Sequence, residues 1–148
     1  MSIPEKEKQL IAEFAQYDDW ADKYVHLIDL GRKLIKYDEN YRNDKYLISG
    51  CQSRVWLHAF LDENNKMIME ADSDSEITKG IISLLVWLYS GESPDDILAA
   101  NENFINEIGL KEHLSPTRSN GLASMLKQIK LYALVFKTKI QQNNNNNG

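Results

Sequence analysis

One residue of this chain has clear scope for covalent chemistry. Cys51 is the only cysteine among 148 residues, and Gly50 precedes it while Gln52 and Ser53 follow. A lone thiol closes no disulfide within the chain, and it needs further ligands to hold zinc or an iron–sulfur cluster. A thiolate is a strong nucleophile, so a functional Cys51 would accept a group on its sulfur and pass it on. The alternative is a cysteine that packs in the core as a small hydrophobic residue.

The residues around Cys51 suit an exposed turn. Gly50 gives the backbone freedom and allows another protein to approach closely. Gln52 and Ser53 offer side-chain donors and acceptors. No histidine–acid pair stands at a recognisable spacing from the cysteine, which disfavours a hydrolase or a one-cysteine peroxidase. A histidine and an acidic residue that are distant in the sequence but brought together near Cys51 by the fold remain an open alternative at this point.

Composition excludes several classes of protein. The chain carries 17 basic and 22 acidic residues, for a net charge of −5, and 43% of its residues are hydrophobic. This balance is typical of a single globular domain and disfavours a general nucleic-acid binder. No apolar run approaches the length of a membrane span, and the N-terminus lacks the apolar stretch of a secretory signal. We therefore expect a cytoplasmic protein with no membrane or nucleic-acid partner, whose thiol stays reduced.

The spacing of the apolar residues changes from a helical to a strand-like period around Cys51. Residues 45–48 are short and β-like, residues 54–61 alternate in polarity, and residues 67–71 return as a further strand after a turn at 63–66. Asparagine tolerates the left-handed backbone of tight hairpin turns. The pattern predicts a small antiparallel sheet of three strands, with Cys51 in the connection between the first and the second.

Helical patterns flank this sheet. Residues 5–17 and a segment capped by Asp18 or Asp19 have helical spacing, and residues 76–90 are apolar on most sides, which predicts a central buried helix that Gly91 ends. Ser73 and Glu76 have the spacing of a capping box. Serine–proline pairs at 93–94 and 115–116 predict two further helix starts. We expect Trp20, Trp56 and Trp87 in the core, one domain over residues 1–140, and a disordered asparagine-rich tail at 141–148.

Residues 50–56 resemble the signature of the SufE family of iron–sulfur cluster assembly. Further segments resemble family motifs in the same order: residues 19–20 with 27–31, 71–74 with 79–81, 89–94, and 113–122. The resemblance extends from about Glu5 to about Lys130. Residues 34–36 lack a proline that the family pattern places nearby, and the asparagine tail is not a family feature.

The resemblance implies an α+β fold shared with scaffold proteins of the IscU type, with the sheet packed against several helices. It implies a sulfur acceptor rather than an enzyme with its own turnover. Cys51 would take a persulfide from a cysteine desulfurase of the SufS or CsdA type, stimulate that enzyme, and pass the sulfur to a SufB-like scaffold. The pyridoxal phosphate belongs to the desulfurase, so the chain needs no cofactor or metal. A monomer or a weak homodimer is expected.

The same resemblance indicates a loop and partner-facing site around Cys51. Its members are Gly50, Gln52, Ser53, Asp72, Asp74 and Arg118. Arg118 is equally consistent with a surface residue of a first helical turn, although a cation is unfavourable there. Asp72 and Asp74 are also consistent with a helix start. We expect the resting Cys51 to be tucked against apolar residues and released when a partner docks.

Two other functions stay open. A cluster scaffold of the same fold would ordinarily need three cysteines, and this chain has one. A binding module could carry Cys51 with no chemical role. Thioester hydrolysis or peroxide consumption by the isolated protein would favour a cysteine enzyme, whereas a cysteine-dependent gain in the sulfide output of a desulfurase would favour the sulfur acceptor.

Overall fold

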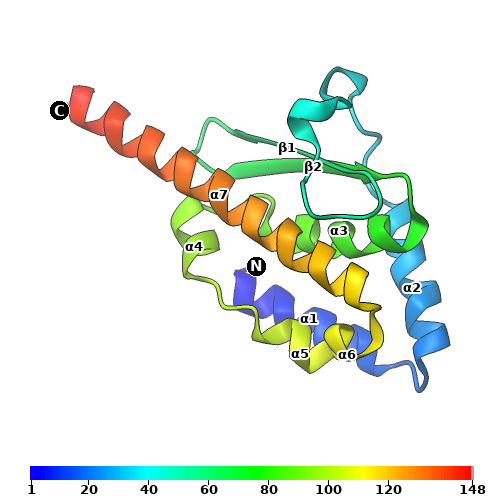
Figure 1. Cartoon of the computed structure of the whole chain (residues 1–148). Coiled ribbons are helices and arrows are strands. Elements are labelled where there is room, and N and C mark those ends of the chain that lie inside the picture. Colours follow the sequence, from blue (N-terminus) through cyan, green and yellow to red (C-terminus); the bar gives the residue numbers. More distant parts are fainter. Residues whose placement is uncertain (148) are drawn as a thin grey trace.

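The computed structural model describes residues 1–147 and shows helices packed on one side of a small sheet (Figure 1). The two strands are β1 (Val55–Leu61) and β2 (Met67–Ser73). The helices are α1 (Ile3–Ala15), α2 (Trp20–Arg32), α3 (Glu76–Tyr89), α4 (Pro94–Ala99), α5 (Asn103–Ile108), α6 (Leu110–His113) and α7 (Pro116–Asn147). Two 3₁₀ helices, Glu39–Tyr41 and Asp44–Tyr46, precede the sheet. The α+β class predicted from the sequence is confirmed.

The sheet has two strands in the described part of the chain, where the sequence predicted three. β1 and β2 pair antiparallel, with Val55 opposite Ser73 and Leu61 opposite Met67. Residues 45–48 contribute only an isolated bridge between Leu47 and Trp56. The side chain of Asn43 accepts a hydrogen bond from the backbone of Lys45 and caps a 3₁₀ turn. Such local side-chain bonds compete with strand pairing, so the third strand does not form.

α3 is the central helix of the core, as the sequence predicted. Ile81, Ile82, Leu85 and Leu88 are buried on it, and it packs against α2 and β2. The predicted capping box is wrong, because the N-cap is Ser75. Ser73, which was predicted as the N-cap, is the last residue of β2. Its hydroxyl donates a hydrogen bond to the Arg54 carbonyl at 2.8 Å instead of capping α3.

α7 runs along the molecule and carries the C-terminus away from the sheet (Figure 1). Its inner face is buried through Leu122, Met125, Leu126, Ile129 and Ala133. The tail differs from the predicted disorder, since α7 continues to Asn147, and the last residue of the chain lies outside the described part. Composition alone indicates disorder, but each residue added to an existing helix gains a backbone hydrogen bond without a new nucleation step.

Burial of the tryptophans follows expectation in two cases. Trp56 is buried, and Trp20 packs against the core. Trp87 on α3 is 40% exposed, so the prediction that it lies in the core is wrong. Among residues 1–147, none of the helices combines the length and apolar character needed to cross a bilayer.

Candidate functional site

Cys51 lies in the connection that leads into β1, next to the first turns of α7. The thiol is half-buried and packs against the edge of the core. Its Sγ donates to the backbone carbonyl oxygen of Gly121 at 3.7 Å, a distance within the range for sulfur donors. A loop and a helix far apart in the sequence therefore meet at the cysteine.

Gly50 and Gly121 lie where the cysteine loop and α7 meet. Gly50 has φ +90°, a left-handed conformation that side chains disfavour. A Cβ on Gly50 would lie 2.4 Å from the Oγ of Ser124 on α7, and a Cβ on Gly121 would lie 3.5 Å from the Sγ of Cys51. The position of the loop against α7 thus depends on Gly50, whereas a Cβ on Gly121 would make only ordinary van der Waals contact with the thiol.

A pocket of about 210 Å³ opens beside the thiol. It is lined by residues from the cysteine loop, from α3 and from the start of α7: Cys51, Gln52, Ser53, Thr78, Ile81, Ser115, Thr117, Arg118, Gly121 and Met125. Four of the predicted site residues, Cys51, Gln52, Ser53 and Arg118, are therefore brought together, and Gly50 adjoins them in the loop. Arg118 reaches this place because α7 begins at Pro116, where the hydroxyl of Ser115 accepts from the Arg118 N–H at 3.3 Å.

Burial raises the pKa of the Cys51 thiol above its ordinary value. The resting sulfur therefore holds its proton at neutral pH, which matches its role as a donor to Gly121. Ile81 and Met125 supply apolar atoms to the wall beside it. The expected resting place against apolar residues is present, while release on docking stays a prediction.

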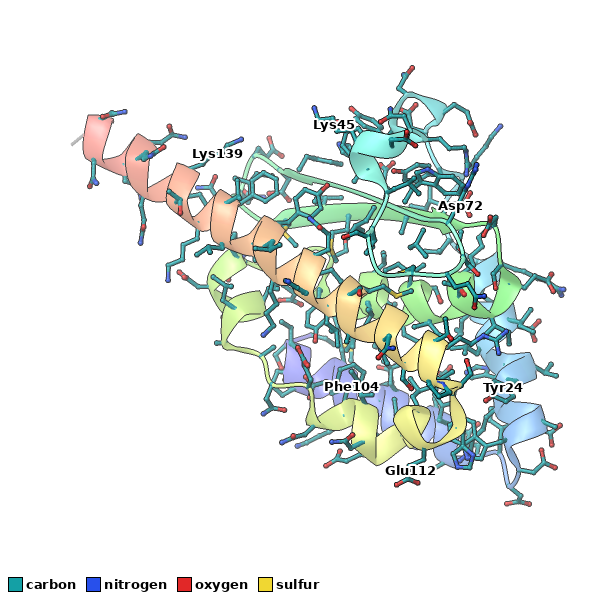
Figure 2. All side chains as sticks on the ribbon, viewed as in Figure 1. Tyr24, Lys45, Asp72, Phe104, Glu112 and Lys139 are labelled. Atoms are coloured by element: carbon teal, nitrogen blue, oxygen red, sulfur yellow. The ribbon has the colours of Figure 1, made fainter. Side chains whose placement is uncertain are left out.

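Asp72 and Asp74 do not line the Cys51 pocket; they hold the frame around it. The carboxylate of Asp74 accepts from the backbone N–H of Arg54 at 3.0 Å, and the Asp74 N–H donates to the Arg54 carbonyl at 3.2 Å. This double link joins the segment after β2 to the segment after the cysteine. Figure 2 labels Asp72 at the neighbouring end of the sheet.

Asp72 forms the centre of an ion-pair network. It lies 2.8 Å from Arg42 and 3.3 Å from Lys79. The Arg42 guanidinium also lies over the rings of Trp56 at 4.8 Å and Tyr37 at 5.4 Å. The network ties residues 37–46 to the sheet and to α3. Sequence analysis missed Arg42, because it stands in a polar stretch with no period to mark it.

Sequence analysis also missed part of the pocket wall. Thr78, Ser115, Thr117 and Met125 line the pocket, but none of them was predicted as a site residue, although Ser115 and Thr117 lie within residues 113–122, which resemble a family motif. The contact between Cys51 and Gly121 had no local signal at all.

Comparison with known proteins identifies the family and the fold of this chain. A family model described as "SufE: Fe-S metabolism associated domain" matches residues 8–133. SufE-like protein 1, chloroplastic/mitochondrial, of Arabidopsis thaliana is 36% identical over 137 residues, which are 93% of this chain and 37% of that protein. The chain thus spans little more than a third of the length of this relative.

A solved structure shares the fold. The solution structure of a hypothetical protein from Thermus thermophilus has a TM-score of 0.74 and 23% identity, and the match covers 93% of this chain and 99% of that one. At this identity the likeness shows the fold alone. The family match covers most of the chain and includes the cysteine loop, the Asp72 network and the start of α7. The chain belongs to the SufE family.

Proposed function

We propose that this chain accepts persulfide sulfur on Cys51 from a pyridoxal-phosphate cysteine desulfurase of the SufS or CsdA type. It stimulates that enzyme by clearing its persulfide, and it passes the sulfur to a SufB-like iron–sulfur scaffold. The observation that carries the proposal is the single thiol of a SufE-family chain, which lines a pocket together with Arg118. The pyridoxal phosphate resides in the desulfurase.

The transfer is an exchange at sulfur. The Cys51 thiolate attacks the outer sulfur of the cysteine persulfide on the desulfurase, and a new S–S bond forms on Cys51. The S–S bond on the desulfurase breaks, and its cysteine leaves as a thiolate. The proton that Cys51 gives up is taken by that leaving thiolate or by solvent, so no external oxidant or reductant is needed.

The resting site restrains this reaction until a partner arrives. Burial raises the pKa of Cys51, and its S–H donates to the Gly121 carbonyl. Both features favour the thiol over the reactive thiolate. A partner that draws the cysteine loop away from α7 would remove both, and so would link ionisation of Cys51 to docking.

The alternative of a cysteine-nucleophile enzyme has less support. Hydrolases and peroxidases that use cysteine lower the pKa of the nucleophile through a neighbouring cation or base. Here the described residues that line the Cys51 pocket include no histidine and no carboxylate that could act as a base, and burial raises the pKa of the thiol.

Intact-protein mass spectrometry tests the proposal. The full chain and its Cys51→Ser variant are each incubated with free cysteine and a cysteine desulfurase, in one experiment of the SufS type and in another of the CsdA type. A gain of one or more sulfur masses on the wild type alone, removed by a reductant, is the expected result. If neither desulfurase type loads the wild type, the proposal fails.

A further inference from the structure

The start of α2 holds the turn that joins α6 to α7. Tyr24 on α2 donates a hydrogen bond from its hydroxyl to the backbone carbonyl oxygen of His113, 89 residues further along the chain (Figure 2). The Trp20 ring stacks on the His113 imidazole, with ring centroids 4.1 Å apart and an interplanar angle of 18°. Trp20 and Tyr24 are half-buried against the core, whereas His113 is exposed. The two contacts therefore tie an exposed turn to a helix that the core fixes in place.

The hydrogen bond to His113 satisfies a carbonyl group that the short helix α6 leaves open. His113 is the last residue of α6, and the last carbonyl groups of a helix have no donor within that helix. The Tyr24 hydroxyl supplies the donor from another element. Removal of this hydroxyl would leave the carbonyl to water and would free the turn to move.

The position of this turn decides where α7 begins. Ser115 lies two residues after His113, and its hydroxyl accepts a hydrogen bond from the Arg118 N–H at 3.3 Å. Ser115 and Arg118 both line the Cys51 pocket. In the next turn of α7, the Gly121 carbonyl accepts the hydrogen bond from the Cys51 thiol at 3.7 Å. The contacts of α2 with His113 thus set the part of α7 that faces the thiol.

Neither Tyr24 nor Trp20 lines the Cys51 pocket, so each acts on the thiol through α7. We propose that Tyr24 and Trp20 are positioning residues for sulfur transfer at Cys51. They hold the first turns of α7, which keeps the Gly121 carbonyl against the thiol and Arg118 in the pocket wall. The transfer itself rests on the proposed function, whereas the positioning of the thiol can be measured without a desulfurase.

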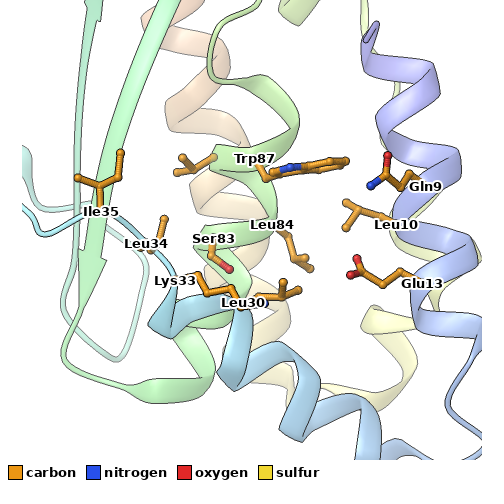
Figure 3. Close-up of a pocket in the computed structure, with 11 residues that line it drawn as sticks. Gln9, Leu10, Glu13, Leu30, Lys33, Leu34, Ile35, Ser83, Leu84 and Trp87 are labelled. Atoms are coloured by element: carbon orange, nitrogen blue, oxygen red, sulfur yellow. The ribbon is translucent and has the colours of Figure 1, made fainter.

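The other end of α2 supplies a control site. There α2 lines an apolar groove of about 330 Å³ together with α1 and α3 (Figure 3). Trp87 lines this groove and, like Trp20, has a lysine near its ring: Lys6 Nζ lies 5.9 Å from the Trp87 centroid, and Lys23 Nζ lies 5.0 Å from that of Trp20. The groove shares no lining residue with the Cys51 pocket. A change at Trp87 therefore removes a partly exposed tryptophan without touching the contacts of α2 with the turn.

Alkylation of Cys51 by iodoacetamide in the folded protein tests the positioning. Tyr24→Phe keeps the ring and removes only the hydroxyl. Its thiol should react about two- to tenfold faster than that of the wild type, the range set by the net loss of one hydrogen bond. Burial raises the pKa of the resting thiol, so a loosened α7 should also lower the pH midpoint of the reaction. Tyr17→Phe is the matched control, because the Tyr17 hydroxyl lies 3.3 Å from His26 between α1 and α2, and it should react like the wild type.

Replacement of the tryptophan tests the stacking contact. Trp20→Leu should speed the alkylation of Cys51, whereas Trp20→Phe keeps an aromatic ring for His113 and should retain most of the protection. Trp87→Leu should leave the alkylation unchanged. Urea unfolding of each variant measures its stability, so that variants of equal stability are compared.

Sulfur loading tests whether the positioning serves the transfer. With a SufS-type desulfurase, Tyr24→Phe should slow the initial sulfur gain of Cys51 roughly two- to fivefold, the size expected when a charge at the rim of a contact is misplaced. Added to Arg118→Ala, the same change should cause no further loss, because Tyr24 acts through the placement of Arg118. If no desulfurase loads the wild type, the proposed function fails, and the alkylation rates still test whether Tyr24 and Trp20 position the thiol.

Three results would overturn the proposal. The first is alkylation of Tyr24→Phe at the wild-type rate, and the second is an equal acceleration in Tyr24→Phe and Tyr17→Phe. The third is a further loss of sulfur loading when Tyr24→Phe is added to Arg118→Ala, since this would make Tyr24 a direct contact of the desulfurase.

Discussion

The Sγ of Cys51 lies 3.7 Å from the carbonyl oxygen of Gly121, 70 residues further along the chain. This contact joins the cysteine loop to α7 and uses the thiol proton as its donor. A thiolate has no proton to give and would face the carbonyl oxygen instead. The contact therefore favours the protonated, resting sulfur and opposes the reactive form.

Alkylation of Cys51 should be slow and should rise at higher pH in the folded protein than in the unfolded one. Burial raises the pKa of the folded thiol, and iodoacetamide reacts with the thiolate. The folded state holds the proton more tightly, so this contribution to stability is full below the unfolded pKa and is lost as pH rises through the folded pKa. The rate of alkylation against pH, with and without urea, checks the shift. A folded midpoint at or below the unfolded one would contradict it.

Replacement of Gly50 by alanine should destabilise the protein more than the same change at Gly91. Both glycines have left-handed backbones, with φ of +90° and +85°, where a Cβ costs about 1–2 kcal/mol. Only at Gly50 would the Cβ also meet Ser124, at 2.4 Å, while Gly91 has open space. Urea unfolding of the two variants measures the difference. Gly50→Ala should also speed alkylation of Cys51, because a Cβ would still lie 3.3 Å from the Cβ of Ser124 after the Ser124 hydroxyl turns away, and this contact pushes the loop from α7. Equal losses of stability and unchanged alkylation would contradict this account.

Features fixed by neighbouring residues were predictable from the sequence. Asp19 and Ser93 cap helices at the predicted places, because each side chain bonds a backbone N–H three residues ahead. α3 was predicted as the central helix because it is apolar on most sides. The predicted third strand does not form. The Asn43 cap that prevents it is also a local feature of the sequence, but the β-like residues 45–48 that follow it dominated the pattern.

Features fixed by distant residues were not predictable. Whether Trp87 is buried depends on where α1 and α2 pass α3, and the resulting groove leaves it partly exposed. The pocket around Cys51 depends on the placement of α7, which only the family resemblance of residues 113–122 signalled. Asp72 and Asp74 were predicted as members of the loop site, but their contacts with Arg42, Lys79 and Arg54 brace the loop from outside the pocket.

Replacement of Asp72 by asparagine should lower the stability and flatten its dependence on acid pH. Burial alone would raise the pKa of Asp72, but hydrogen bonds from Arg42, the Ser73 N–H and Lys79 outweigh it, so the pKa lies below its usual range. The stabilisation is present above the unfolded pKa and is lost as pH falls through the folded pKa. Loss of charged hydrogen bonds at this largely buried site should cost about 1–3 kcal/mol at neutral pH.

Asp29→Asn is the matched control for Asp72→Asn. Asp29 is 54% exposed and lies 3.8 Å from Arg32, so its removal should change the free energy of unfolding very little. Urea unfolding at several pH values between neutral and acid measures both variants. A loss of similar size in the two variants, or an unchanged acid dependence in Asp72→Asn, would show that the Asp72 network does not hold this end of the sheet.

Replacement of Arg118 by alanine should slow sulfur loading of Cys51 by the desulfurase roughly two- to fivefold, the range expected for an exposed charge at the rim of a contact. Arg118 lines the Cys51 pocket, so its charge faces an incoming partner. Arg118→Lys should retain most of the rate, because it keeps the charge.

Lys127→Ala removes a charge from α7 outside the pocket lining and should leave the rate unchanged. The initial rate of sulfur gain, by mass spectrometry with limiting desulfurase, compares them. Equal effects of Arg118→Ala and Lys127→Ala would mean that the overall charge of α7 matters, rather than the position of Arg118 beside the thiol.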